Sequence, residues 1–489
     1  IINKNKQVLI MLPEISLTPQ FEERFIARFG FSPYLWHSKV SEKNKKIIWH
    51  SCYKEIPIVI VGTRSSLFLP LNNLGLIIVD EEHDLSFKQE ENIRYHARDL
   101  AVLKAKIENI PIILSSATPS LETHYNIENK NFTHLFLPAQ FSGLQLPDIE
   151  LIDMKREILE KDHWVSKKII KTLNESLKNG EQCLLFLNRR GYSPLVLCKS
   201  CGFRYQCNQC SSWLVLHKKT NRLLCHHCGS IFSIQVNCIK CKNKNSLKTI
   251  GPGVERLAEE VKEIFPNYII KIMSSDNANT PNKIKKIIND FENKKIDILV
   301  ATQIMAKGYH FPNLSVVGVI DSDLGLKGGD MRAIERTYNL LQQVSGRAGR
   351  SKKVGKVFIQ TYFPDNPVIQ SLKNRNRTSF VKQALNERKE FNIPPFSFMT
   401  ALIISGGSKA KVESLANELV KNRIIDENIE ILGPVEAPIF LLRGRYRYRL
   451  LLKGSNRNKL NIFTKKMIEK TEIPSTLRVT IDVDPYTFM

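Results

Sequence analysis

The sequence predicts an α/β protein built from parallel sheets, with a metal-binding insert and a small α+β domain at its C-terminal end. Short apolar runs alternate with helical stretches along most of the 489 residues, which is the pattern of parallel α/β layers. Eight of the ten cysteines form four Cys-x-x-Cys pairs within one segment. Polar residues follow directly after several apolar runs, at the sheet edge where ligands bind in such folds.

The composition is that of a soluble globular chain with a strongly basic balance. Hydrophobic residues make up 42% and charged residues 25%, and no apolar run reaches the length of a membrane span. The net charge of +24 allows two interpretations. Either the surface is rich in lysine, or Lys and Arg neutralise the phosphates of a polyanionic partner. The N-terminal residues do not form a signal peptide, so we expect a cytoplasmic protein.

The first polar strand end belongs to an apolar run at residues 76–79, which is followed by Asp-Glu-Glu-His. Asp80 at this position can hold Mg²⁺ through water, and Glu81 can orient the water that attacks a nucleotide. The next such strand covers residues 112–114 and leads into Ser-Ser-Ala-Thr. These hydroxyls can sense the γ-phosphate, although Thr118 or Ser120 could instead be an ordinary helix N-cap.

Two further motifs lie in the second half of the chain. The apolar run at residues 298–301 leads into Thr302 and Gln303, and Lys307-Gly308 follows. Residues 343–350 read Gln-Val-Ser-Gly-Arg-Ala-Gly-Arg, and we expect Arg347 and Arg350 on one helical face. Guanidinium groups can stabilise charge on a transferring phosphoryl group. Alone, this motif could be the solvated start of a basic helix.

The cysteine pairs predict two structural zinc sites, because each Cys-x-x-Cys turns two sulfurs toward one point. Cytosolic thiols stay reduced, which disfavours a disulfide cluster. The apolar residues between the middle pairs fit a β-hairpin, which favours a nested pairing over a crossed one. His217, His226 and His227 could be ligands, but eight thiolates suffice. The nested sites are Cys198, Cys201, Cys238 and Cys241 for the first zinc, and Cys207, Cys210, Cys225 and Cys228 for the second.

The order of the strand-end motifs along the chain resembles the order of motifs in superfamily-2 DExH helicases, which have two RecA-like lobes. The match extends over essentially the whole chain to the bacterial primosomal replication-restart helicases, because the paired cysteines interrupt the second lobe and five further segments agree. These segments are residues 12–20, 61–66, 188–192, 433–438 and 482–485. The resemblance implies a 3′→5′ DNA helicase that recognises stalled or collapsed forks and initiates primosome assembly for replication restart.

The resemblance also implies site residues and partners. ATP with Mg²⁺ would be bound by Asp80, Glu81, His83, Gln343, Arg347 and Arg350. DNA would be contacted by Thr63, Arg64, Phe87, Arg94, Tyr95, Thr302, Lys307 and Arg445. Residues 87–96 resemble an aromatic-rich loop in which Phe87, Arg94, Tyr95 and His96 could stack bases, although the loop could also be a surface connection with buried aromatics. The arginines of residues 443–449 suit DNA and the acidic tail of the single-stranded-DNA-binding protein, unless they form a solvated strand face. Other primosome proteins are further expected partners, and no membrane is.

The predicted domains are lobe 1 at residues 1–144, lobe 2 at 145–197 and 243–371, the two-zinc insert at 198–242, and a C-terminal DNA- and partner-binding domain at 372–489. The family's Gly-x-x-Gly-x-Gly-Lys-Thr phosphate loop does not occur in these residues. We therefore expect a truncated chain that shows no DNA-stimulated ATPase by itself. Two alternatives stay open, a generic superfamily-2 translocase or RNA helicase, which the cysteines disfavour, and a non-catalytic scaffold that binds DNA and partners.

Overall fold

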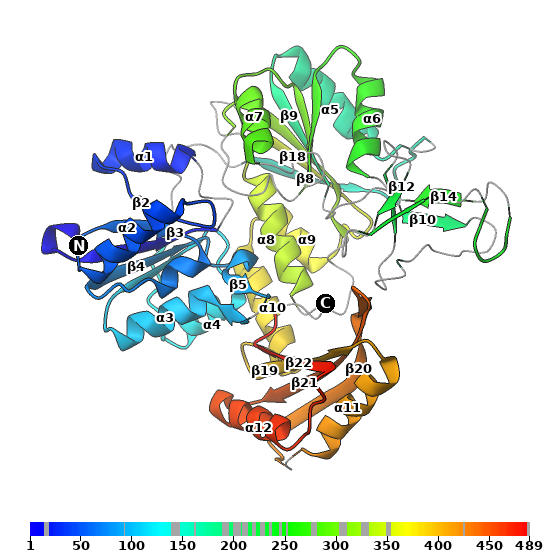
Figure 1. The fold of residues 1–489 in the computed structure, drawn as a ribbon. Helices are drawn as coiled ribbons and strands as arrows, with labels where there is room; N and C mark the ends of the chain where they lie inside the picture. The colour runs from blue at the N-terminus through cyan, green and yellow to red at the C-terminus, as the bar shows by residue number, and fades with distance from the viewer. Residues whose placement is uncertain are drawn as a thin grey trace. The chain divides into compact units, whose positions relative to one another are not determined.

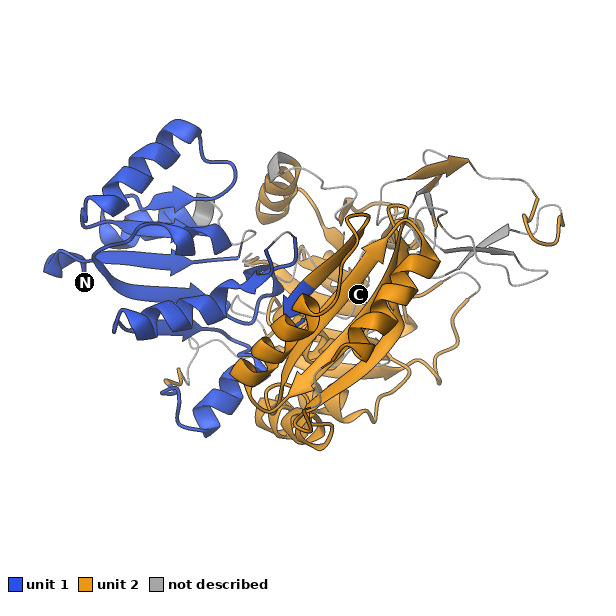
Figure 2. Cartoon of the chain, turned by 60° about the horizontal axis from the view of Figure 1, so that its bottom comes forward, with its two compact units in different colours: residues 1–134, 481–486 blue, residues 135–480, 487–489 orange. Residues whose placement is uncertain are grey.

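The computed structural model divides the chain into two compact units (Figures 1 and 2). Unit 1 comprises Ile1–His134 and Ile481–Tyr486, and unit 2 comprises Leu135–Thr480 and Thr487–Met489. The structure describes residues 1–13, 19–91, 93–137, 147–160, 163–187, 195–198, 207, 214–217, 222–224, 230–233, 237–243, 247–250, 253–274, 281–302, 311–323, 332–348, 354–423 and 426–486.

Unit 1 contains a sheet of five parallel strands in the order β2-β3-β1-β4-β7. The strands are β1 (Gln7–Met11), β2 (Tyr34–Trp36), β3 (Val59–Gly62), β4 (Leu74–Asp80) and β7 (Ile112–Ser115). The helices are α1 (Pro19–Phe29), α2 (Glu42–Tyr53), α3 (Ala97–Ile107) and α4 (Leu121–Glu128). Leu9, Ile60 and Ile77 on the central strands are fully buried, as expected for a parallel sheet covered on both faces. This confirms the first predicted α/β layer.

Unit 2 contains a second parallel sheet, of six strands in the order β15-β16-β9-β17-β18-β8. Its strands are β8 (Asp148–Asp153), β9 (Gln182–Leu187), β15 (Ile270–Met273), β16 (Ile298–Ala301), β17 (Leu314–Asp321) and β18 (Lys356–Thr361). Its helices are α5 (Lys167–Lys178), α6 (Val254–Ile264), α7 (Pro281–Glu292), α8 (Ala333–Ser345), α9 (Pro367–Lys373) and α10 (Arg377–Glu390). Every residue of β9 is buried, so the second predicted α/β layer is also confirmed.

The cysteine-rich segment contributes an antiparallel sheet in the order β13-β12-β11-β10-β14. Its short strands are β10 (Leu195–Cys198), β11 (Val215–His217), β12 (Arg222–Leu224), β13 (Ile231–Ser233) and β14 (Leu247–Ile250). In β11 and β12, Leu216 lies opposite Leu223, and His217 lies opposite Arg222. The β-hairpin predicted between the two middle cysteine pairs is therefore present.

The last part of unit 2 is an α+β domain with a sheet in the order β20-β21-β19-β22. Its elements are β19 (Phe398–Gly406), α11 (Lys409–Lys421), β20 (Ile429–Leu442), β21 (Arg445–Gly454), α12 (Arg457–Glu469) and β22 (Leu477–Val483). Arg443 and Gly444 join β20 to β21 with φ angles of +50° and +74°, the conformation of a two-residue hairpin turn. Residues Ile481–Tyr486, which include the last residues of β22, belong to unit 1.

None of the helices in the described parts of the chain combines the length and the apolar character that a bilayer crossing requires.

Candidate nucleotide site, zinc segment and DNA-binding surface

The acidic and hydroxyl motifs of unit 1 lie side by side at one edge of its sheet. Strand β4 ends at Asp80, which pairs in register with Ser115 at the end of the parallel strand β7. Carboxyl ends of parallel strands meet at the edge where ligands bind in open α/β sheets. The structure therefore brings the two predicted motifs together.

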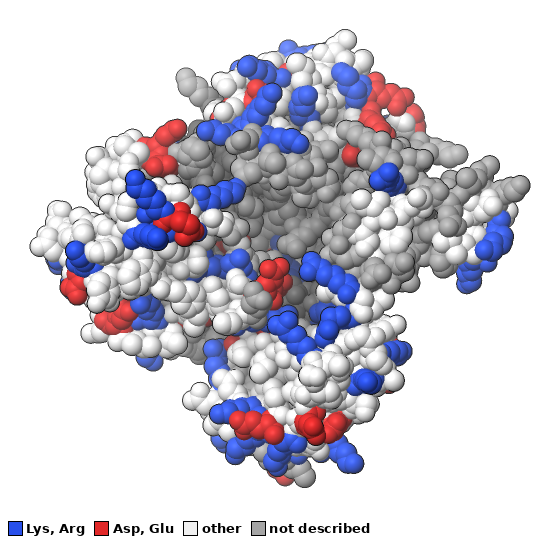
Figure 3. All heavy atoms as spheres, viewed as in Figure 1, with Lys and Arg blue, Asp and Glu red and all other residues white. Residues whose placement is uncertain are grey.

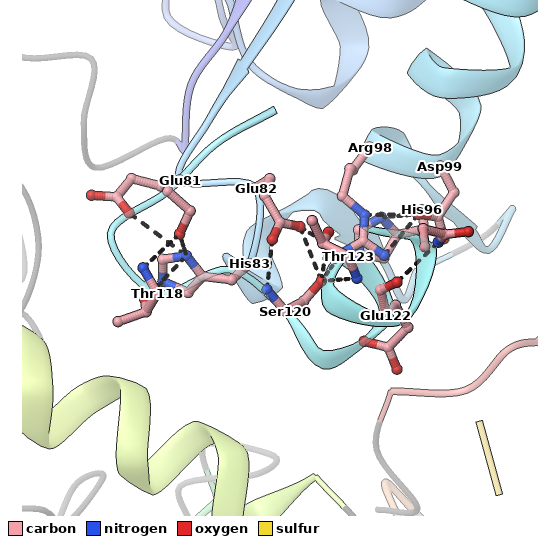
Figure 4. Close-up of polar contacts among 12 residues, drawn as sticks. Glu81, Glu82, His83, His96, Arg98, Asp99, Thr118, Ser120, Glu122 and Thr123 are labelled. Atoms are coloured by element: carbon pink, nitrogen blue, oxygen red, sulfur yellow. Dashed lines mark hydrogen bonds and ion pairs between the residues drawn. The ribbon is translucent and has the colours of Figure 1, made fainter. Parts of the chain in front are cut away.

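His83 is the residue that connects these motifs (Figure 4). Its Nδ1 atom lies 2.7 Å from Ser116 Oγ and its Nε2 atom lies 3.2 Å from Thr118 Oγ1. The same Nδ1 atom is 3.6 Å from Glu81 Oε2. One imidazole ring therefore contacts both hydroxyls and lies next to the Glu81 carboxylate.

Glu81 has a left-handed backbone conformation, with a φ of +50°. This conformation is uncommon for a residue with a side chain, and such strain gathers at functional sites. The turn is held by hydrogen bonds from the Glu82 N–H to Ser115 O at 3.1 Å and from the Asp84 N–H to Glu81 O at 2.8 Å. The strained turn separates the side chains of Glu81 and Glu82.

Glu82 has a structural environment that the sequence did not reveal. It is 1% exposed and its carboxylate accepts hydrogen bonds from the Ser120 N–H at 2.6 Å, the Ser120 hydroxyl at 3.1 Å and Arg98 Nη1 at 2.8 Å. Burial opposes protonation of the guanidinium, but Asp99 and the other nearby acidic groups raise the pKa of Arg98 well above its ordinary value. Glu82 and Arg98 are therefore a buried ion pair behind the motif.

The segment Gly62-Thr63-Arg64 forms a close turn after β3. A Cβ atom on Gly62 would lie 2.5 Å from Ser66 Cβ and 2.9 Å from Trp36 O, so only glycine fits there. Thr63 is buried, and its N–H donates to Trp36 O at 3.1 Å. Arg64 Nη1 donates to the carbonyl oxygen of Lys88 at 2.9 Å. Of the two predicted DNA contacts, Arg64 lies nearer the surface.

The segment from residue 87 to residue 96 contains the short ribbon of β5 (Lys88–Gln89) and β6 (Tyr95–His96). Phe87 is fully buried in the core of unit 1, so its predicted role in stacking bases does not fit: its ring faces apolar neighbours and leaves no face for a base. The half-buried Tyr95 ring packs edge-on against Phe68, with ring centroids 5.1 Å apart. Phe68 is 62% exposed and is an aromatic candidate that the sequence pattern did not single out.

Two other predicted residues of this segment contact the end of the chain. Arg94 Nη1 lies 2.7 Å from Asp482 Oδ2, and the His96 ring lies 4.7 Å from the Tyr486 ring. Both side chains are therefore engaged within unit 1 in this conformation.

In unit 2, Thr302 follows β16 and is buried, with its N–H donating to Met273 O at 3.2 Å. Gln343 lies in α8, but the helix ends at Ser345, and Arg347 lies in the turn after it. The prediction that the arginines share a helical face is wrong for Arg347, because the helix ends at a Gly346 C-cap. Lys307 and Arg350 lie outside the described residues.

Helix α8 is held by α10 through polar and aromatic contacts. Glu335 forms a buried ion pair with Arg388 at 2.6 Å. Tyr338 stacks on Phe380 with ring centroids 3.9 Å apart, and burial raises the pKa of Tyr338. These contacts fix α8, which contains Gln343 and ends shortly before Arg347.

The zinc segment is described in part. Cys238 and Cys241 share a tight turn in which the Lys242 N–H donates to Cys238 O at 2.8 Å and the Cys238 N–H donates to Asn243 O at 3.0 Å. Cys198 is the last residue of β10 and pairs with Leu247 of β14. Leu247 follows the turn of Cys238 and Cys241 by a few residues in the sequence. Cys207 is buried. Cys201, Cys210, Cys225 and Cys228 lie outside the described residues, and within those ranges no three His, Cys, Asp or Glu side chains gather as metal ligands.

Arg445, Arg447 and Arg449 lie on β21, which agrees with the strand interpretation of this run. Arg445 is exposed, and its Nη2 donates to Ser405 O at 2.8 Å. Arg449, by contrast, is 8% exposed. Figure 3 shows basic side chains dispersed over the viewed face with acidic ones among them.

Two parallel sheets with these strand-end motifs define the chain as a helicase. Family models support each part of it. The DEAD/DEAH box helicase model matches residues 1–127, and the helicase conserved C-terminal domain model matches residues 236–352. The PriA DNA helicase Cys-rich region model matches residues 207–231, and the primosomal protein N C-terminal domain model matches residues 389–486.

Relatives named replication restart protein PriA align with nearly the whole chain. The protein of Rickettsia prowazekii (strain Madrid E) is 47% identical over 485 residues, which are 99% of this chain and 75% of the relative. Those of Bacillus subtilis (strain 168) and Haemophilus influenzae are each 36% identical, and the chain spans 61% and 66% of their lengths. The chain therefore belongs to the PriA family of replication restart helicases.

Proposed function

We propose that these residues belong to a helicase that couples ATP hydrolysis to 3′→5′ unwinding of DNA at stalled or collapsed replication forks, and so begins primosome assembly. The observation that carries the proposal is the His83 contact with Ser116 and Thr118 beside Glu81. It joins the predicted hydrolytic carboxylate to hydroxyls that can respond to a γ-phosphate. Membership in the PriA family supports the task at the fork.

Asp80 and Glu81 would serve ATP with Mg²⁺. Their carboxylate oxygens, with the hydroxyls of Ser116 and Thr118 beside them, are the hard oxygen donors that Mg²⁺ prefers. The bound ion would neutralise charge on the phosphates. Glu81 would orient the attacking water, and His83 would transmit the position of Glu81 to the hydroxyls. Gln343, Arg347 and Arg350 would complete the ATP site, the two arginines stabilising charge on the transferring phosphoryl group.

The cysteines would hold two Zn²⁺ ions in nested sites. The β11–β12 hairpin supports the inner site, because it reverses the chain direction between the two middle cysteine pairs of the sequence. Strand pairing of Cys198 with Leu247 supports the outer site, because Leu247 closely follows the turn of Cys238 and Cys241. Thiolate ligands of this number suit a closed structural site without an open coordination position.

DNA would be contacted by residues of both parallel sheets and of the C-terminal domain. Main-chain N–H groups, hydroxyls and guanidinium groups are the usual donors to phosphate. The candidates are Thr63, Arg64, Arg94, Tyr95, Thr302, Lys307 and Arg445, and Phe68 joins them as an exposed aromatic. The arginines of β21 suit the acidic tail of the single-stranded-DNA-binding protein, and the zinc segment suits the duplex or other primosome proteins.

The test compares unwinding of forked DNA and of a linear duplex with a 3′ overhang by the full-length protein. We expect ATP-dependent unwinding with a preference for the fork, and we expect Asp80→Asn to abolish ATP turnover while DNA binding is kept. Glu128→Gln is the matched control, because this exposed carboxylate in α4 lies outside the motif. Equal unwinding of both substrates would indicate a generic translocase. Fork binding without any binding of an ATP analogue would indicate a scaffold.

A further inference from the structure

The end of the described chain, Ile481–Tyr486, is packed into unit 1 through a cluster of buried charges. We call these six residues the tail. Asp482 is 4% exposed and faces two cations. Its Oδ1 lies 2.8 Å from Lys88 Nζ, and its Oδ2 lies 2.7 Å from Arg94 Nη1. One carboxylate thus pairs with the first residue of β5 and with the residue that precedes β6.

Lys88 makes three contacts with the tail. Its ammonium group donates hydrogen bonds to the main-chain oxygens of Val483 at 2.8 Å and Asp484 at 3.3 Å. It also forms an ion pair with Asp482 Oδ1 at 2.8 Å. Lys88 is itself 4% exposed, so withdrawal of the tail would leave a buried ammonium group without these acceptors, which is costly.

Tyr486 extends the contact to the acidic motif. Its hydroxyl accepts a hydrogen bond from Arg98 Nη2 at 3.2 Å. The same guanidinium donates through Nη1 to Glu82 at 2.8 Å and to Ser120 at 2.9 Å. Glu82 directly follows Glu81, and Ser120 closely follows Thr118. Arg98 therefore links the tail to Glu82 and Ser120, which lie close in sequence to the proposed site residues Glu81 and Thr118.

Several proposed DNA-binding residues contact this segment or belong to it. Arg64 donates to the main-chain oxygen of Lys88 at 2.9 Å, while the Lys88 side chain is held by the tail. Tyr95 lies between Arg94, which pairs with Asp482, and His96, whose ring contacts Tyr486. The tail thus contacts a segment that includes or touches proposed DNA-binding residues and that reaches Glu82 of the acidic motif through Arg98.

We propose that Asp482 and Tyr486 are positioning residues, which hold the segment from Lys88 to Arg98 so that DNA binding accelerates ATP hydrolysis. This inference rests on the proposed function. The tail touches neither ATP nor DNA in this account and acts through Lys88, Arg94 and Arg98. A buried charge cluster is often no more stabilising than apolar packing, and in some proteins such groups select one arrangement among alternatives. That property suits a segment that must take one defined position.

The experiment measures ATP turnover of the full-length protein with and without single-stranded DNA for wild type, Asp482→Asn and Tyr486→Phe. We expect both variants to keep the DNA-independent rate and to lose about fivefold or more of the DNA stimulation, the lower part of the usual range for coupled sites. Glu91→Gln is the control, because it removes one exposed carboxylate from the same segment. We expect single-stranded DNA to stimulate the ATP turnover of Glu91→Gln as much as that of the wild type.

Hydrogen exchange separates positioning from misfolding. In Asp482→Asn we expect faster exchange in residues 88–98, with unchanged protection of β1 and β4. Tyr486→Phe removes one hydroxyl and keeps the ring against His96, so it tests the coupling even if Asp482→Asn unfolds. Normal DNA stimulation in folded Tyr486→Phe and Asp482→Asn would overturn the inference. Absence of DNA stimulation in the wild type would instead overturn the proposed function.

Discussion

Replacement of Arg98 by Met is expected to destabilise unit 1 strongly. Arg98 is 5% exposed and Glu82 is 1% exposed, so the substitution leaves a carboxylate buried without its cation. Breaking such a pair by removing one partner costs about 3–5 kcal/mol. Glu82 keeps two hydrogen bonds from Ser120, so we expect the lower end, about 3 kcal/mol.

Native-state hydrogen exchange of the α3 and α4 amides measures this loss locally. A loss of about 3 kcal/mol corresponds to more than 100-fold faster exchange of the slowest amides. Arg28→Met is the matched control, because Arg28 is an exposed arginine of α1 in the same unit. We expect that variant to exchange like the wild type.

The double variant Glu82→Leu with Arg98→Met gives a second check on the same reasoning. It removes both charges, and apolar replacement of a whole buried pair is often neutral in stability. We therefore expect the α3 and α4 amides to exchange more slowly in the double variant than in Arg98→Met alone. The coupling free energy between positions 82 and 98 should be about 1 kcal/mol or more. Less than about tenfold faster exchange in Arg98→Met would refute the account of this ion pair.

Three further predictions follow from single sites. Gly62→Ala should lower the melting temperature and weaken single-stranded DNA binding in an anisotropy titration, because its Cβ would collide with Ser66 and Trp36; unchanged binding and melting would contradict this. Burial raises the pKa of Glu260, so the folded state holds this proton longer, and stability should fall as pH rises from about the ordinary value toward the raised one. Urea titrations across this interval should show a flatter pH dependence for Glu260→Gln, and parallel curves would contradict the burial effect. Metal analysis should find two Zn²⁺ per chain and about one after Cys238→Ser, whereas an unchanged count would exclude Cys238 as a ligand.

Local patterns in the sequence were sufficient to predict the parallel sheets and the strand-end motifs. The apolar run before Asp80 and the run before Ser115 are each self-contained, and parallel pairing places their ends at one edge. The hairpin of β11 and β12 could be predicted in the same way, because its two strands are close in sequence. In each case the residues that decide the element lie within a few positions of one another.

Side-chain burial and contacts between residues far apart in the sequence were harder to predict from the sequence. Glu81 and Glu82 are adjacent and chemically alike, yet the strained turn separates them and only Glu82 is buried against Arg98. An aromatic residue in a polar segment, such as Phe87, is compatible with either a stacking surface or a core position. The contact between Arg94 and Asp482 spans 388 residues, and no periodicity reports on such a pair.

The helix end before Arg347 shows a third limit. Gly346 caps α8, and glycine near a helix end is a recognised stop signal. The spacing of the two arginines indicates a shared helical face only where the helix continues past this glycine. A glycine directly before the first arginine favours a turn there over a continuous helical face.

We expect the edge formed by Glu81, His83 and the two hydroxyls to couple ATP hydrolysis to strand separation. This coupling is measured as the number of base pairs of forked DNA unwound per ATP hydrolysed by the full-length protein and by its His83→Ala variant. We expect this ratio to fall about tenfold in His83→Ala, the effect of roughly one lost hydrogen bond on the coupling. A His83→Ala variant that hydrolyses ATP and keeps the wild-type ratio would show that His83 has no such role.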